Sequence, residues 1–222
     1  MSRLGWDPKE GDSDLDKLLR VLAIGSSSKY GDQSVIDEAI KRFRETPDAL
    51  DDDIRGKVYR IVVKHGDAED YEKILSIYRN APMQAQKLQA LSALGATTDE
   101  SLIQRTLEFS LSEEVRTQDL IYGVSSVSSD VRGSEHAWRF LTSHWAEYNE
   151  KLAGSGYLLA ACIKSAAGCF SSEARALEIE AFFQSHPTPQ AERAVQQTLE
   201  SIRSRSAWFS RDCDKVAHFF AV

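Results

Sequence analysis

The fold class is decided by the stretch VIDEAIKRF at residues 35–43, whose apolar side chains recur at the spacing of an α-helix. Because successive helical residues turn by about 100°, the apolar residues all share one face: Val35, Ile36, Ala39, Ile40 and Phe43. A strand would instead alternate apolar and polar residues. We therefore predict a helix that buries one face in a core.

The same periodicity extends in both directions along the chain. Apolar residues three and four apart recur in further segments, at residues 15–22, 58–62, 74–78, 88–94 and 102–109. Gly, Pro and polar turn residues interrupt this pattern at short intervals and cut the chain into about a dozen helices. We found no strict internal repeat. The sequence predicts an all-α fold, an irregular HEAT- or armadillo-like α-superhelix, as a single domain over residues 1–222.

Several predicted helix starts carry capping residues. Thr98 or Asp99, and Ser171 or Ser172, can each cap a helix through a side-chain oxygen that accepts an orphan backbone N–H. Pro189 stands at a first helical position, where its missing donor costs nothing.

The composition is that of an ordinary folded protein, with 42% hydrophobic and 27% charged residues. The net charge of -7 disfavours a surface built to neutralise nucleic-acid phosphates, so nucleic acid is not expected as a partner. No stretch reaches the roughly 18 apolar residues that a membrane-spanning helix needs, so no membrane partner is expected.

The N-terminus and the cysteines indicate a reducing setting. The first residues lack the apolar core of a signal peptide, and the three cysteines are few and odd in number. We therefore expect a cytoplasmic protein. Cys162 and Cys169 stand seven residues apart, without C-x-x-C spacing, and we predict that both are buried structural thiols.

Motifs for catalysis are absent. None of the five histidines is followed by Glu, so H-E-x-x-H is missing, and His136 and His144 are eight residues apart, too far to share one tetrahedral ion. No phosphate-binding loop and no G-x-S-x-G motif occurs. We predict no catalytic residue, no metal site and no cofactor in this chain.

Two conspicuous clusters have structural explanations. The acidic run at residues 51–53 precedes an apolar-periodic segment, where carboxylates favourably face a helix N-terminus. Trp138, Phe140 and Trp145 are expected to pack between helices, since aromatic residues are common core anchors.

A polar segment at residues 109–119 separates two apolar helical stretches. It permits two interpretations, and its spacing favours the first, a solvated turn between helices. In the second, Arg116, Gln118 and Asp119 present a guanidinium, an amide and a carboxylate to a cavity. Such groups suit a peptide backbone or a C-terminal carboxylate.

Five segments identify a family when they are taken in order: LGWDPK at 4–9, VVKHGD at 62–67, LSEEVRTQD at 111–119, AFFQSHP at 181–187 and AER at 191–193. Together they resemble the C-terminal helical domain of puromycin-sensitive aminopeptidases, which belong to the gluzincin, aminopeptidase N-like zinc aminopeptidases. The similar segments run from residue 4 to about residue 209 and so cover nearly the whole chain.

The resemblance implies an enzyme that removes N-terminal residues from peptides with one zinc ion. In the family that ion is held by H-E-x-x-H and a distant Glu upstream of this domain, so this chain would lack peptidase activity by itself. The resemblance also implies that the domain closes over the active-site chamber and contacts the peptide. Arg116 is then the expected substrate contact, Gln118 and Asp119 orient it, and Arg193 is a further candidate.

The expected partners are therefore the catalytic domain of the same enzyme and a peptide substrate. The family's domain usually begins earlier, so we expect a truncation at the N-terminal end, near Met1 and Ser2. A helical stack cut in this way exposes an apolar end face, from which we expect weak self-association through the N-terminal helices. One alternative stays open, a free-standing adaptor that binds a protein or peptide in its groove. An independent hydrolase would require stoichiometric zinc, which we do not expect.

Overall fold

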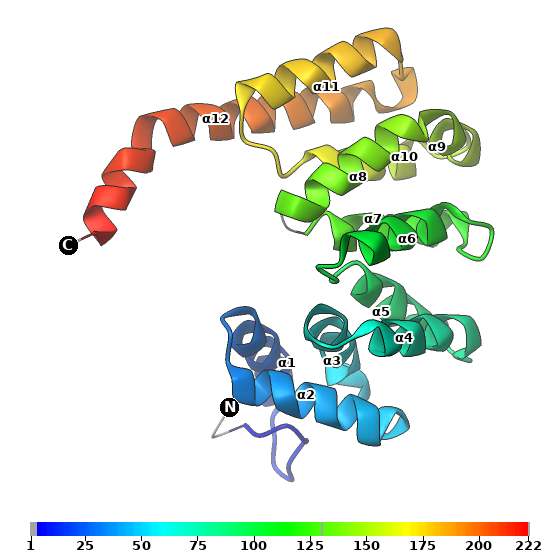
Figure 1. Ribbon diagram of the computed structural model, residues 1–222, viewed down its shortest axis with the longest axis vertical. Helices are drawn as coiled ribbons and strands as arrows, with labels where there is room; N and C mark the ends of the chain where they lie inside the picture. Colours follow the sequence, from blue (N-terminus) through cyan, green and yellow to red (C-terminus); the bar gives the residue numbers. More distant parts are fainter. Residues whose placement is uncertain (1–3, 130, 222) are drawn as a thin grey trace. The chain divides into compact units, whose positions relative to one another are not determined.

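The computed structural model describes residues 4–129 and 131–221, which leaves Met1 and Ser2 outside the described residues. These ranges hold helices and no strand, which confirms the all-α prediction and the expected number of helices (Figure 1). The twelve α-helices are α1 (Asp14–Lys29), α2 (Gln33–Glu45), α3 (Asp52–His65), α4 (Ala68–Asn80), α5 (Gln84–Leu94), α6 (Glu100–Leu111), α7 (Leu120–Val127), α8 (Val131–Ser143), α9 (Trp145–Lys151), α10 (Gly156–Ala167), α11 (Glu173–Ser185) and α12 (Glu192–Phe220). The 3₁₀ helices are η1 (Pro47–Ala49), η2 (Thr117–Asp119) and η3 (Pro189–Ala191).

The chain divides into two compact units, residues 1–106 and 107–222. In the first unit α3 is central, because it packs on α1, α2, α4 and α5, and its Val58, Tyr59 and Val62 are fully buried. In the second unit α10 has the same role and packs on α7, α8 and α12. In both units a helix lies against helices close to it in sequence, as expected for serial stacking. That residues 1–222 act as a single domain stays a prediction.

The predicted helix caps can be assigned to particular residues. Asp99 accepts the backbone N–H groups of Ser101 at 2.8 Å and Leu102 at 3.1 Å at the start of α6. Ser172 caps α11 by accepting the N–H of Arg175 at 3.4 Å. Pro189 does occupy a first helical position, but in the short η3 that precedes α12.

The acidic run is a helix cap, as predicted. Asp51 accepts the N–H of Asp53 at 2.9 Å and so begins α3. The carboxylate satisfies an orphan donor and faces the positive end of the helix.

The aromatic residues pack between helices, as predicted. Trp138 and Trp145 are buried and meet the rings of Phe182 and Phe183 of α11 edge-on or tilted, at 5.4–6.2 Å between ring centroids. The Trp138 indole Nε1–H donates to Glu178 at 2.8 Å. This cluster ties α8 and α9 to α11 within the second unit.

The prediction for the cysteines is half wrong. Cys162 is fully buried in α10, whereas Cys169 is exposed. Cys169 lies beyond the end of α10, in the connection to α11, and its Sγ–H donates to the Ser128 carbonyl at 3.2 Å. Because it is outside the helix, the periodicity that buries Cys162 does not apply to it.

We expect the three thiols to differ in reactivity. Burial raises the pKa of the Cys162 thiol to about 12, so at pH 8 almost none of it is thiolate, the reactive form. With Ellman's reagent, Cys169 and Cys213 should react quickly and Cys162 only after denaturation. The Cys169→Ser and Cys213→Ser variants should each lose one fast thiol, and a fast thiol that survives both substitutions would contradict this expectation.

Candidate functional site

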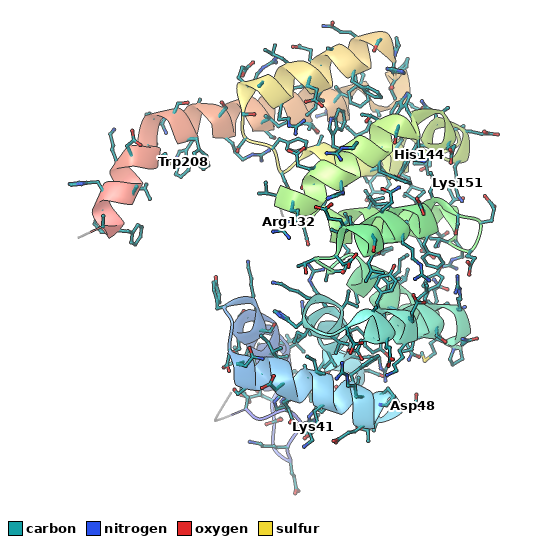
Figure 2. All side chains as sticks on the ribbon, in the orientation of Figure 1. Lys41, Asp48, Arg132, His144, Lys151 and Trp208 are labelled. Atoms are coloured by element: carbon teal, nitrogen blue, oxygen red, sulfur yellow. The ribbon has the colours of Figure 1, made fainter. Side chains whose placement is uncertain are left out.

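The segment between α6 and α7 is held in place by a lysine from a third helix. Lys151, in the last turn of α9, donates through Nζ to the carbonyls of Leu111 and Ser112, both at 2.7 Å, and to Glu113 at 3.2 Å (Figure 2). These carbonyls belong to the C-terminal end of α6, where helix carbonyls have no partner within the helix and a cation is favoured. Val115 is 1% exposed and anchors the same segment in the core.

Arg116 and Asp119 form an ion pair within this segment. The Arg116 Nε–H donates to Asp119 Oδ2 at 2.7 Å, and the Asp119 N–H donates to the Arg116 carbonyl at 2.8 Å. The Asp119 side chain is 3% exposed, whereas the Arg116 side chain is 52% exposed. A buried carboxylate therefore orients a guanidinium that reaches solvent. The guanidinium has five N–H donors in a planar fork, and its Nε–H is the donor that pairs with Asp119 Oδ2.

The other two candidate residues differ in their position. Gln118 is exposed and lies in η2 between Arg116 and Asp119, so the structure brings these three residues together. Arg193 is also exposed, but it is the second residue of α12, which packs on α10, α11 and η3. It therefore stands on a different element from the pair.

An open groove lies between α11 and α12, near the turn that joins them. Its volume is about 280 Å³, and its floor is made by the buried side chains of Phe183, Val195 and Leu199. Glu192 lines it as well, together with Glu180, which is paired with Arg203 at 2.7 Å. The groove thus joins an apolar floor to acidic groups, which suits an apolar or basic side chain of a peptide.

Neither Lys151 nor the groove was anticipated from the sequence. Lys151 is one of many lysines in the chain, and its contacts lie about 40 positions earlier, so no local pattern marks it. The groove floor consists of periodic apolar residues that belong to two helices. That periodicity predicts burial and says nothing about a gap between the helices.

The described ranges contain no group of three His, Cys, Asp or Glu side chains arranged to hold a metal ion. In the same part of the chain, none of the helices is both long enough and apolar enough to span a bilayer.

Helices that stack serially on neighbours close in sequence define an all-α domain of the helical-repeat class. Residues 1–204 match the family described as the ERAP1-like C-terminal domain, and the chain belongs to that family. The resemblance to puromycin-sensitive aminopeptidases is thereby confirmed at the level of the family, which includes such enzymes among its relatives.

Similar proteins occur in plants, yeast and a nematode. Aminopeptidase M1 of Arabidopsis thaliana is 35% identical over 93% of this chain and 24% of its own length. Alanine/arginine aminopeptidase of Saccharomyces cerevisiae is 29% identical over 99% of the chain and 26% of its own length. Puromycin-sensitive aminopeptidase of Caenorhabditis elegans is 26% identical over 91% and 22%. The chain thus spans about a quarter of the length of these relatives and corresponds to their C-terminal domain.

Loss of the Lys151 ammonium should destabilise the second unit. Lys151→Ala would leave the carbonyls at the end of α6 without their partner, at a cost of about 1–3 kcal/mol of unfolding free energy. The matched control is Lys164→Ala, because Lys164 is exposed and donates to Gln197 at the surface, so its loss should change stability by less than about 0.5 kcal/mol. The measurement is the urea midpoint, and equal midpoints for the two variants would refute the anchoring role.

Proposed function

We propose that this chain is a non-catalytic C-terminal domain of a zinc aminopeptidase, which closes over the active-site chamber and contacts the peptide substrate. The Arg116–Asp119 pair is the observation that carries the proposal, because a half-exposed guanidinium is held ready by a buried carboxylate. The names of the relatives support it, since plant, yeast and nematode proteins of this family are all called aminopeptidases.

In this proposal Arg116 binds the distal part of the peptide. A guanidinium can grip a carboxylate through two parallel N–H donors, and Arg stays charged at any pH at which a protein is folded. Gln118 adds an amide that can pair with a peptide backbone, and Asp119 positions Arg116. Arg193, on α12, is a further contact for a longer peptide.

The zinc ion and the catalytic residues are assigned to the catalytic domain, the proposed partner of this chain. We propose the cytoplasm as the location. The cysteines support this location, because Cys162, Cys169 and Cys213 are all free thiols, as expected in a reducing compartment.

The direct test is hydrolysis of an aminoacyl fluorogenic substrate with added zinc. The purified chain should be inactive alone and should restore activity when it is mixed with a separately expressed catalytic domain. Activity of the chain alone would support the independent hydrolase. Inactivity in both cases would remove the support for the accessory role.

Arg116→Ala should weaken the binding of long peptides in the reconstituted enzyme. Loss of a charged hydrogen bond of about 1.5–3 kcal/mol corresponds to a rise in KM of roughly 10- to 150-fold, with little change for an aminoacyl substrate too short to reach Arg116. The charge-conserving control is Arg116→Lys, which should retain part of the effect, and circular dichroism should confirm that each variant folds. An equal loss for short and long substrates would argue for misfolding instead of lost peptide contact.

The groove between α11 and α12 favours the second candidate function, a free-standing adaptor. Its acidic residues and apolar floor could hold a basic or apolar segment of another protein. Stable binding of such a partner, with no effect on peptidase activity, would support the adaptor and would be abolished by Val195→Trp, which fills the groove.

Weak self-association through the N-terminal helices also stays a prediction. It is supported by an apolar stripe on α1, where Leu15, Leu18, Leu19 and Leu22 are 43–76% exposed. In the stacking seen elsewhere such a stripe would be covered by another helix. The double variant Leu18→Gln/Leu22→Gln should therefore lower the mass-average molecular weight at high concentration in sedimentation equilibrium. An unchanged weight would contradict a role for α1.

A further inference from the structure

The Lys151 ammonium is almost enclosed, and each of its donors has an acceptor. The side chain is 14% exposed, and its three N–H groups face the carbonyls of Leu111 and Ser112 and the carboxylate of Glu113 (Figure 2). Glu113 is 99% exposed, so water screens its attraction and the two carbonyls are the stronger partners. Because an enclosed ammonium is costly unless its donors are matched, these carbonyls are held in one position relative to α9.

The backbone that carries Lys151 is itself fixed in the core of the second unit. Lys151 is the last residue of α9. Tyr148, one turn earlier, is 1% exposed and meets the ring of Phe140 of α8 edge-on at 6.4 Å. Leu152, the next residue, is also 1% exposed. The lysine therefore ties the segment after α6 to a part of the structure that does not depend on that segment for its own position.

The contacts continue from Ser112 towards Arg116. The Ser112 carbonyl that accepts from Lys151 also accepts the backbone N–H of Val115 at 3.4 Å, and the Ser112 hydroxyl accepts the N–H of Glu114 at 3.3 Å. Val115 is 1% exposed and directly precedes Arg116. The backbone of Arg116 is thus reached from the Lys151 ammonium through one shared carbonyl and one buried side chain.

Arg116 is held from its other side as well. Its carbonyl accepts the N–H of Asp119 at 2.8 Å, and Leu120, which follows Asp119, is fully buried at the start of α7. All these residues belong to the second unit. Between the two fixed ends lie only a few residues, so the position of the guanidinium depends on both ends being kept in place.

We propose that Lys151 is a positioning residue for peptide binding: it fixes the segment after α6 so that the Arg116 guanidinium stays where it meets the distal part of the peptide. The inference rests on the proposed function, in which Arg116 contacts the substrate. A group that is ordered before its ligand arrives loses less entropy on binding. The affinity for long peptides therefore depends on Lys151, although its own donors are used within the domain.

Lys151→Met tests this inference in the reconstituted enzyme, because it keeps an unbranched apolar stem and removes only the ammonium. It should raise KM for long peptides by roughly 3- to 10-fold and leave kcat and the KM of a short aminoacyl substrate unchanged. Lys151→Arg, which retains cationic donors, should recover part of the loss. The matched control is Lys164→Met, whose lysine donates to Gln197 at the surface at 2.8 Å, and it should behave as the unaltered chain.

The double variant Lys151→Met/Arg116→Ala separates positioning from a general effect on folding. Without Arg116 there is no guanidinium to position, so its KM for long peptides should equal that of Arg116→Ala within about twofold. Independent effects that multiply, or a loss that the short substrate shares, would overturn the proposal. Circular dichroism should show that each variant is folded under the assay conditions.

Amide hydrogen exchange on the chain alone gives a readout that needs no peptidase activity. Lys151→Met should speed exchange at Glu114, Val115 and Asp119 by roughly tenfold, and Lys164→Met should not. Unchanged exchange would overturn the positioning role even if peptide binding by Arg116 is correct. If Arg116→Ala leaves the KM for long peptides unchanged, the peptide contact itself is wrong and the inference falls with it, so the two failures can be told apart.

Discussion

The structure depends on one constraint: a helix with a single apolar stripe must bury that stripe, and here it does so against helices close to it in sequence. In the first unit α3 supplies the surface on which its neighbours pack, and in the second unit α10 does so. The constraint explains the fully buried residues of these two helices, such as Val62 and Cys162.

The candidate site follows from the same stacking, with charge added. Where α6 ends, its carbonyls need donors, and Lys151 reaches them only because α9 packs beside that end. The loop so fixed leads into η2, where the buried Asp119 holds Arg116. A side chain that contacts a ligand is most effective when other groups limit its motion, since the entropy of ordering it has already been lost on folding.

The exposed apolar residues of α1 and α12 and the groove between α11 and α12 are surfaces of different chemistry. The α1 stripe is aliphatic, and the end of α12 is aromatic with balanced charge. The groove between α11 and α12 is small and has an apolar floor with Glu180 and Glu192 in its lining. These surfaces differ in size and charge, so each suits a partner of a different chemistry.

The sequence by itself determined the helices, since their apolar periods and their caps at Asp51, Asp99 and Ser172 are local features that act within one or two turns. It also determined the family, through segments of matching residues. Only the tertiary structure decided that Cys169 is exposed and that Lys151 anchors the end of α6. The physical reason is range: periodicity and capping are settled by neighbours in the chain, whereas burial of a loop residue and the partner of a charge depend on which distant helices pack beside it.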